Sequence, residues 1–293
     1  MDVALRADAT LGEAPTWDFA TSSLLWVDIL GPSGQPDTDG IGLAHRLYPQ
    51  TGIDDVMELP QHVGAVKPRI AGGLVANLRD GIALLDNDGG KRWLVYWARD
   101  GVRGNDAAVD PSGSLWAGTV RYDGARGGWL ARVRPDGRAS VVVEDTAMSN
   151  GIGWSPDGTR MYYVDSPSRR IDVFDFDVAD GEATNRRPLC TVDGTPGGPD
   201  GLCVDADGCV WVALWGGGAI RRYTPDGALD RETPVPVSQP TACCFGGGDL
   251  TDLFITTARA GLSEEALAGQ PLAGSILVLP GAGAGLPTPV FTG

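Results

Sequence analysis

Four polar residues with oxygen atoms suited to metal binding each precede the same kind of strand by four positions. They are Glu13, Asn105, Asn150 and Asp200. If the chain folds as a radial repeat, side chains of equal phase lie at equal height and meet at the central axis. Two carboxylates crowded there need a proton or a cation, and together with amide oxygens they form a hard donor set. The shared phase therefore predicts a metal site built from oxygen ligands.

A recurring strand pattern supports such a radial arrangement. Apolar strand cores that end in a small or polar residue occur six times, at residues 25–28, 74–77, 115–118, 162–165, 210–213 and 253–256. Their last residues are separated by 49, 41, 47, 48 and 43 positions, and a strand-filled period in the forties is typical of propeller blades. Turns rich in Pro, Asp and Gly punctuate the repeats, so each blade is expected to hold four antiparallel strands. We predict one domain over residues 1–293, an all-β six-bladed β-propeller.

Two other interpretations of these residues stay open at this point. Carried through all six repeats, the phase gives a ring of Glu13, His62, Asn105, Asn150, Asp200 and Thr241. Asn-Gly at 150–151 and Asp-Gly at 200–201 are also ordinary hairpin-turn dipeptides. A kelch propeller would explain the Gly pairs, but these do not keep one phase, and a WD40 array would need more than the single Trp-Asp pair at 17–18.

Composition excludes several classes of partner. A net charge of −15 without any run of Lys or Arg opposes binding to nucleic acid and to anionic membranes. The first residues lack a targeting signal and no apolar run approaches membrane-spanning length, so the cytoplasm and a monomeric state are the default expectations. An odd number of cysteines, five, favours small buried thiols over disulfides.

Other catalytic devices are scarce in this chain. His45 and His62 are the only histidines and no Gly-x-Ser-x-Gly motif occurs, which argues against a serine-histidine triad. Lys67 and Lys91, the only lysines, are expected at the surface. Ser263 is expected to cap a short helix, residues 281–289 to form a flexible tail, and the insertion at 31–42 to cover the mouth of the channel.

Several motifs resemble one known family over nearly the whole chain. They lie at residues 11–17, 103–106, 109–119, 149–151, 199–202 and 254–263. In these segments the sequence resembles the senescence marker protein (regucalcin), gluconolactonase and luciferin-regenerating enzyme family of six-bladed propellers, and within it the bacterial sugar lactonases. Ala14 departs from the pattern, because the family usually has Gly at that position.

The resemblance implies one divalent metal ion, which could be Ca, Zn, Mn, Fe or Mg. Its ligands would be the glutamate, asparagine and aspartate that match the family motifs, namely Glu13, Asn150 and Asp200. The family's substrate-binding arginine and asparagine match Arg103 and Asn105, and an acidic substrate contact falls near Asp123.

The function implied is hydrolysis of aldonolactones, such as gluconolactone or xylonolactone, to aldonic acids by metal-activated water. Asp200 is expected to accept a proton from the attacking water, because a ligating carboxylate is the nearest base. Two alternatives are a calcium-binding propeller without catalysis and a lactonase or esterase with substrates other than sugars.

Overall fold

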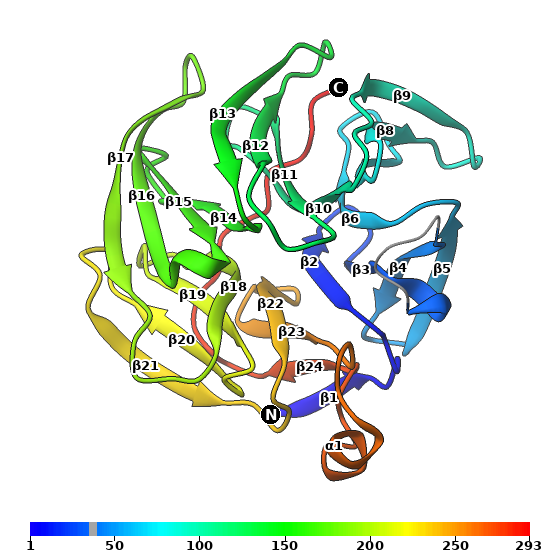
Figure 1. The fold of residues 1–293 in the computed structure, drawn as a ribbon, viewed down its shortest axis with the longest axis vertical. Helices are drawn as coiled ribbons and strands as arrows, with labels where there is room; N and C mark the ends of the chain where they lie inside the picture. Colours follow the sequence, from blue (N-terminus) through cyan, green and yellow to red (C-terminus); the bar gives the residue numbers. More distant parts are fainter. Residues whose placement is uncertain (35–39) are drawn as a thin grey trace.

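The computed structural model describes residues 1–34 and 40–293, which form a closed ring of six sheets (Figure 1). Each sheet contains four strands, and every strand pairing within a sheet is antiparallel. The predicted all-β, six-bladed β-propeller is thereby confirmed. Residues 35–39, within the insertion expected to cover the channel mouth, lie outside the described part of the chain.

Five sheets follow the order of the chain, with the first strand innermost. The first comprises β2 (Gly12–Asp18), β3 (Ser23–Asp28), β4 (Gly42–Tyr48) and β5 (Ile53–Leu59). The second comprises β6 (Val63–Pro68), β7 (Leu74–Leu78), β8 (Gly81–Leu85) and β9 (Lys91–Tyr96). The third comprises β10 (Val102–Val109), β11 (Leu115–Arg121), β12 (Gly128–Val133) and β13 (Ala139–Thr146).

The last three sheets complete the ring. The fourth comprises β14 (Ser149–Trp154), β15 (Arg160–Asp165), β16 (Arg170–Asp177) and β17 (Glu182–Thr191). The fifth comprises β18 (Gly198–Val204), β19 (Val210–Trp215), β20 (Ala219–Tyr223) and β21 (Leu229–Pro234). The sixth comprises β22 (Pro240–Gly246), β23 (Asp252–Thr257), β24 (Ile276–Leu279) and β1 (Asp2–Leu5). Because β1 pairs with β24, the two ends of the chain share one sheet and close the ring.

Burial falls from the axis outward. The inner strands β2, β6 and β14 are buried along their whole length, whereas β5 and β21 are mostly exposed. Each inner strand contacts its neighbours on both sides, so six inner strands surround the axis (Figure 1). Large side chains fill the space between the sheets, including the fully buried Trp17, Trp26, Trp116 and Trp211. Residues that occupy the same position in different repeats therefore lie close together around the axis.

An aspartate–tryptophan hydrogen bond recurs in two blades and explains one of the repeated motifs. In the fifth blade, Asp205 accepts hydrogen bonds from the backbone N–H groups of Asp207 and Cys209 and from Trp211 Nε1 at 2.8 Å. In the third blade, Asp110 accepts from Trp116 Nε1 at 2.8 Å in the same way. One carboxylate thus holds a tight turn and orients the buried indole of the following strand.

Removing this carboxylate is expected to weaken the fold. Asp205→Ala leaves three donors and the Arg222 guanidinium, bonded to Asp205 at 2.8 Å, without their acceptor. We expect the free energy of unfolding in denaturant titrations to fall by about 3 kcal/mol. Asp207→Ala is the matched control, since Asp207 is 81% exposed and its ion pair with Arg222 contributes less than about 1 kcal/mol. Equal losses in the two variants would contradict this role.

The expected short helix is present as α1 (Glu264–Gly269), with Ser263 Oγ accepting from the N–H of Ala266 at 3.2 Å. Two short 3₁₀ helices are also present. η1 (Gly31–Ser33) follows β3 in the first blade, and η2 (Ser166–Ser168) follows β15 in the fourth blade. All five cysteines are free, as expected, and Cys209, Cys243 and Cys244 are buried. Within residues 1–34 and 40–293, no helix has the length and apolar character needed to cross a membrane.

The C-terminal segment differs from the flexible tail expected for it. The carbonyl of Ala284 accepts from the N–H of Ala206 at 2.7 Å, and the N–H of Phe291 bonds to the carbonyl of Pro68 at 2.9 Å. Phe291 is fully buried. The segment runs from β24 across the ring to the region of β10 and β12 (Figure 1). The expectation was wrong because several blades supply backbone partners to the segment, a tertiary effect that local Gly and Pro content does not reveal.

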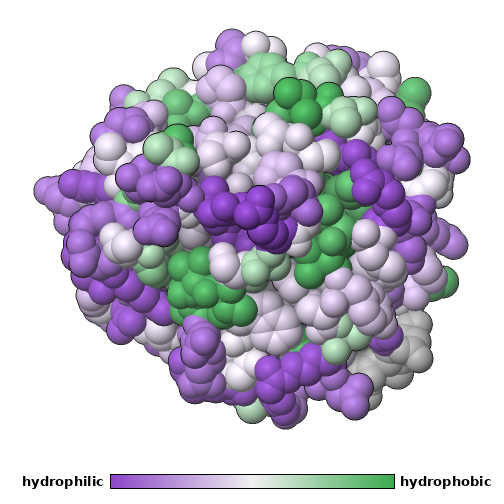
Figure 2. All heavy atoms as spheres, turned by 90° about the horizontal axis from the view of Figure 1, so that it is seen from above, coloured by the Kyte–Doolittle hydropathy of each residue, from purple (hydrophilic) through white to green (hydrophobic). Residues whose placement is uncertain are grey.

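The rim of the ring carries a mixed surface. Figure 2 shows the molecule from its edge, with hydrophobic residues in separate patches among hydrophilic ones. The exposed large apolar residues include Val56, Tyr96 and Val141, which belong to the outer strands β5, β9 and β13. Apolar residues scattered in this way are normal for a protein surface.

Candidate functional site

Every inner strand has a β-bulge close to the predicted ring position. The pairing register shifts between Glu13 and Thr16 in β2, and between Asn150 and Ile152 in β14. Equivalent shifts occur in β6, β10, β18 and β22. A bulge adds a residue to one strand and redirects its side chains, and bulges are frequent beside functional sites. The repeated bulge therefore gives the ring side chains their common orientation.

Ala14 shows the local cost of this geometry. It follows Glu13 in the bulge of β2, is buried and has φ of 49°, in the left-handed region. A residue with a Cβ atom loses about 1 kcal/mol there, whereas Gly adopts this conformation without strain. Ala14, which stands where the family usually has Gly, therefore keeps the bulge but strains the backbone locally.

A chain of hydrogen bonds joins three of the predicted site residues. Arg103 Nη1 donates to Asn105 Oδ1 at 2.8 Å, and Asn105 Nδ2 donates to Asn150 Oδ1 at 2.6 Å. Asn150 Nδ2 donates in turn to Ser166 Oγ at 2.7 Å. These bonds fix both amide groups with their oxygen atoms defined, so Asn150 Oδ1 is the atom available to a cation.

Two buried carboxylates lie close enough to this chain to influence each other. Burial raises the pKa of Glu13 to about 8, and the charge of Asp106 adds to the shift. Burial likewise raises the pKa of Asp200, and the charge of Glu13 raises it further. A hydrogen bond from Asn150 acts in the opposite direction on Asp200. The structure thus brings Glu13, Asn150 and Asp200 into one electrostatically coupled cluster.

The charges of this cluster do not balance. Three carboxylates, the buried Glu13 and Asp200 and the half-buried Asp106, face two basic groups, Arg103 and Lys67, which leaves one negative charge uncompensated when all are ionised. Neither Glu13 nor Asp200 forms an ion pair within the part of the chain that the structure describes. Burying unpaired carboxylates is costly, and a bound cation removes the cost.

The residues present fit a divalent cation. Two carboxylates and an amide oxygen form a hard donor set, and water can complete the coordination of such an ion. The set contains only two acidic side chains; no cluster of three or more His, Cys, Asp or Glu side chains suited to a metal occurs among the described residues. Glu13, Asn150 and Asp200 are therefore the groups that would hold the ion.

Asp123 does not join this cluster. It lies in the turn after β11, its side chain is 55% exposed, and it forms an ion pair with Arg121. The hydrogen bond from Arg121 lowers its pKa to about 2. Its neighbour Tyr122 is directed inward, with its hydroxyl 2.9 Å from His62 Nδ1. Tyr122 also interacts electrostatically with Arg103, so it is a site residue that the sequence motifs did not identify.

Lys67 also differs from its expected position. The expectation of a surface lysine was wrong for Lys67, which is 6% exposed and donates from Nζ to Thr16 Oγ1 at 2.5 Å. Lys91 is exposed, as expected. Lys67 lies in β6, four residues after Val63, and the signal for its burial was the apolar character of that whole strand. Lys67 and Asp106 lie close enough to Glu13 along the channel for their charges to affect its pKa.

Comparisons with known proteins agree with this architecture. The family model described as SMP-30/Gluconolactonase/LRE-like region matches residues 11–259. The 6-deoxy-6-sulfogluconolactonase of Pseudomonas putida is 37% identical over 294 residues, covering 99% of this chain and 97% of that protein. The regucalcin of Danio rerio is 34% identical over 302 residues, covering 100% of this chain and 98% of that protein.

A solved structure is similar over almost its whole length. The calcium-binding protein regucalcin from Agrobacterium tumefaciens superposes with a TM-score of 0.92 at 30% sequence identity, covering 99% of this chain and 96% of that chain. The match of family model, sequence and fold over the same residues confirms the resemblance seen in the motifs. The chain therefore belongs to the SMP-30/gluconolactonase/LRE-like family.

Proposed function

We propose that this protein is a metal-dependent lactonase that opens aldonolactones to aldonic acids. The observation that carries the proposal is the coupled cluster of Glu13, Asn150 and Asp200 at the bulges of three inner strands. Membership of a family that includes lactonases supports lactone hydrolysis as the reaction class. A divalent ion held by this cluster would polarise the lactone carbonyl and lower the pKa of a water molecule.

The side chains around the ion have separate roles in this proposal. Asp200 would accept the proton of the attacking water, because its buried carboxylate would hold the ion and would be the base nearest to a water bound there. Arg103, whose Nη1 donates to Asn105, presents its remaining donors to the hydroxyl groups or the carbonyl of the lactone, and Asn105 offers its Oδ1 as an acceptor to a substrate hydroxyl. Asp123 is proposed only as an outer contact, since its carboxylate must leave Arg121 to meet a substrate.

The proposal is tested by removing and restoring the metal. Chelator-treated protein receives Ca²⁺, Mg²⁺, Mn²⁺, Fe²⁺ or Zn²⁺ separately, and proton release from gluconolactone, xylonolactone and a sulfonated gluconolactone is followed at constant pH. We expect acceleration over the buffer rate with at least one metal and none with the metal-free protein. Absence of acceleration with every metal and every lactone would refute the proposed activity.

The regucalcin relatives keep a second candidate open. One solved relative is described as a calcium-binding protein, and a calcium-binding propeller without catalysis would use the same three ligands. It would bind Ca²⁺ in calorimetry while leaving every lactone at the buffer rate. A lactonase with substrates other than sugars would instead prefer lactones without hydroxyl groups, and the same panel separates these cases.

Arg103→Met tests the proposed substrate contact. The substitution removes a guanidinium whose Nη1 bonds to Asn105 and to the carbonyl of Gly104. We expect KM for an aldonolactone to rise about tenfold with a smaller change in kcat, because a charge-assisted hydrogen bond to substrate is lost. Arg99→Met, at an exposed position ahead of the same strand, is the control. An unchanged KM in Arg103→Met would remove Arg103 from the binding site.

A further inference from the structure

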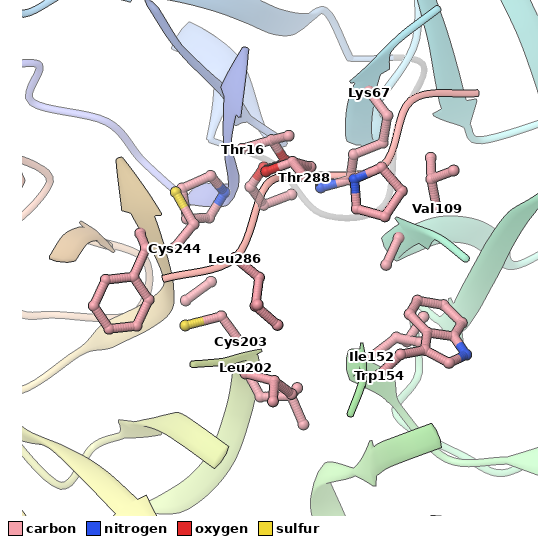
Figure 3. Close-up of a pocket in the computed structure, with 18 of the residues that line it drawn as sticks. Thr16, Lys67, Val109, Ile152, Trp154, Leu202, Cys203, Cys244, Leu286 and Thr288 are labelled. Atoms are coloured by element: carbon pink, nitrogen blue, oxygen red, sulfur yellow. Dashed lines mark hydrogen bonds between the residues drawn. The ribbon is translucent and has the colours of Figure 1, made fainter. Parts of the chain in front are cut away.

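A cavity lies further along the channel and contains none of the proposed metal ligands or substrate-binding residues, while Lys67 and Asp106 of the charge cluster belong to its lining. Its volume is about 430 Å³. Figure 3 shows part of its lining. The lining comes from the inner strands and the turns that follow them, one to six residues beyond the ring positions, and from the C-terminal segment. The cavity therefore adjoins the proposed site and has an apolar lining of its own.

The walls of this cavity are largely apolar. Ile152 and Trp154 of β14, Leu202 and Val204 of β18, and Phe245 of β22 line it. All five are buried, and they belong to three neighbouring blades. A space of this size and character suits a small organic molecule with an apolar body.

Two side chains of opposite charge, Lys67 and Asp106, also line the cavity. Lys67 is nine-tenths buried and points into the cavity, and its ammonium donates one hydrogen bond, to Thr16 Oγ1. Two of its three N–H groups have no hydrogen-bond acceptor within the described chain. Asp106 also lines the cavity, and its Oδ1 accepts from the N–H of Ala107 at 2.7 Å. Unused donors on a buried ammonium point to a ligand that accepts hydrogen bonds.

The C-terminal segment covers the cavity as a strap. Residues 286–289 line it, and Leu286 points into it (Figure 3). Gly285 is bonded on one side to the carbonyl of Leu250 at 2.8 Å, and Phe291 on the other side to the carbonyl of Pro68 at 2.9 Å. Between these two anchors, the backbone N–H groups form no hydrogen bond within the described residues. The strap is thus held by backbone hydrogen bonds at its two ends and not along the part that lines the cavity.

We propose that this cavity binds a neutral carboxamide carried on an apolar body. The carbonyl oxygen of the amide accepts from Lys67, its NH₂ group donates to Asp106, and the apolar body lies against Ile152, Leu202 and Phe245. The head group follows from charge complementarity. A carboxylate would meet the like charge of Asp106 and an ammonium that of Lys67, whereas an amide satisfies both. This site does not depend on the proposed lactonase activity.

Thiol protection provides the test, because Cys203 and Cys244 line the cavity and Cys190 lies outside it in β17. The whole protein is treated with methyl methanethiosulfonate, and the labelling rate of each cysteine is measured by mass spectrometry. The probes are octanamide, octanoate and octylamine, which differ only in their head group. We expect octanamide to slow labelling of Cys203 and Cys244 at about tenfold lower concentration than the two charged probes. Labelling of Cys190 serves as the internal control.

Variants connect this protection to the two charged residues. Lys67→Met weakens protection by octanamide about tenfold, and Lys91→Met, the exposed lysine, leaves it unchanged. Asp106→Asn removes the like charge and shifts the preference toward octanoate. Circular dichroism and denaturant titration of each variant establish that it is folded. Equal protection by all three probes, no protection by any of them, or unaltered protection in Lys67→Met would overturn the proposal.

Discussion

Replacing Asp200 with asparagine is expected to lower kcat/KM for an aldonolactone by about a thousandfold or more. The substitution keeps the shape of the side chain, and removes a carboxylate that is both a proposed metal ligand and the proposed proton acceptor. Asp200 is buried beside Asn150 and Glu13, so no solvent-exposed group replaces it easily. Proton release at constant pH, with the most effective metal at saturating concentration, measures the loss.

Two comparisons separate the roles of Asp200. Glu13→Gln removes one proposed ligand and leaves the proposed proton acceptor, so at saturating metal it should recover more activity than Asp200→Asn. Calorimetric titration gives the metal affinity of each variant independently of turnover. Asp207→Asn, an exposed change in the same blade, is the control for nonspecific effects. Activity of Asp200→Asn close to that of the unaltered protein would exclude Asp200 from catalysis.

The second large effect concerns stability and pH in the metal-free protein. Burial, followed by the charge of Asp106, raises the pKa of Glu13 from its ordinary value of 4.5 to about 8. Between these pH values the folded protein holds a proton that the unfolded chain releases. The resulting stabilisation is complete below pH 4.5 and is lost as the pH rises to about 8. Asp200, whose pKa is also raised, acts in the same direction.

Glu13→Gln isolates this contribution. At the upper end of the window the metal-free variant should be more stable than the metal-free unaltered protein, by on the order of a few kcal/mol. At the lower end the two should be equally stable. Denaturant titrations in the presence of chelator measure both, and Glu182→Gln on the exposed strand β17 is the control. A stabilisation that does not vary with pH would contradict the buried-carboxylate explanation.

Adding the metal should reverse the order of stability of the two proteins at high pH. Binding requires the ionised carboxylates, so the unaltered protein gains stability from the metal, and the gain grows as the pH rises. Glu13→Gln lacks one ligand and should gain less. The cluster that destabilises the metal-free protein at high pH is thus the one proposed to bind the cation.

Repetition made much of the site predictable. Glu13, Asn150 and Asp200 share a phase with their own strands, and a ring of blades converts equal phase into a common position. Asn105 shares this phase, four positions before Val109 in the same inner strand, whereas Arg103 was implied by the resemblance to the family motif at residues 103–106. The cap at Ser263 was predictable for a similar reason, since capping involves neighbours in the chain.

The residues that were misjudged depend on contacts between distant segments. Lys67 is buried beside Thr16 and Asp106, which belong to other blades. The sequence around Lys67 does not reveal these two neighbours. The C-terminal segment has the composition of a loose tail, yet Pro68 and Ala206, far away in the sequence, hold it across the ring.

The chain order alone therefore specifies which residues recur and at what spacing, because strands, turns and blade period are properties of short segments. Only the assembled ring decides what those residues experience. The raised pKa of Glu13, the burial of Lys67 and the cavity beneath the C-terminal strap arise from desolvation and charge among different blades. Such effects act through space, and the distances that control them exist only after the first and last strands have paired.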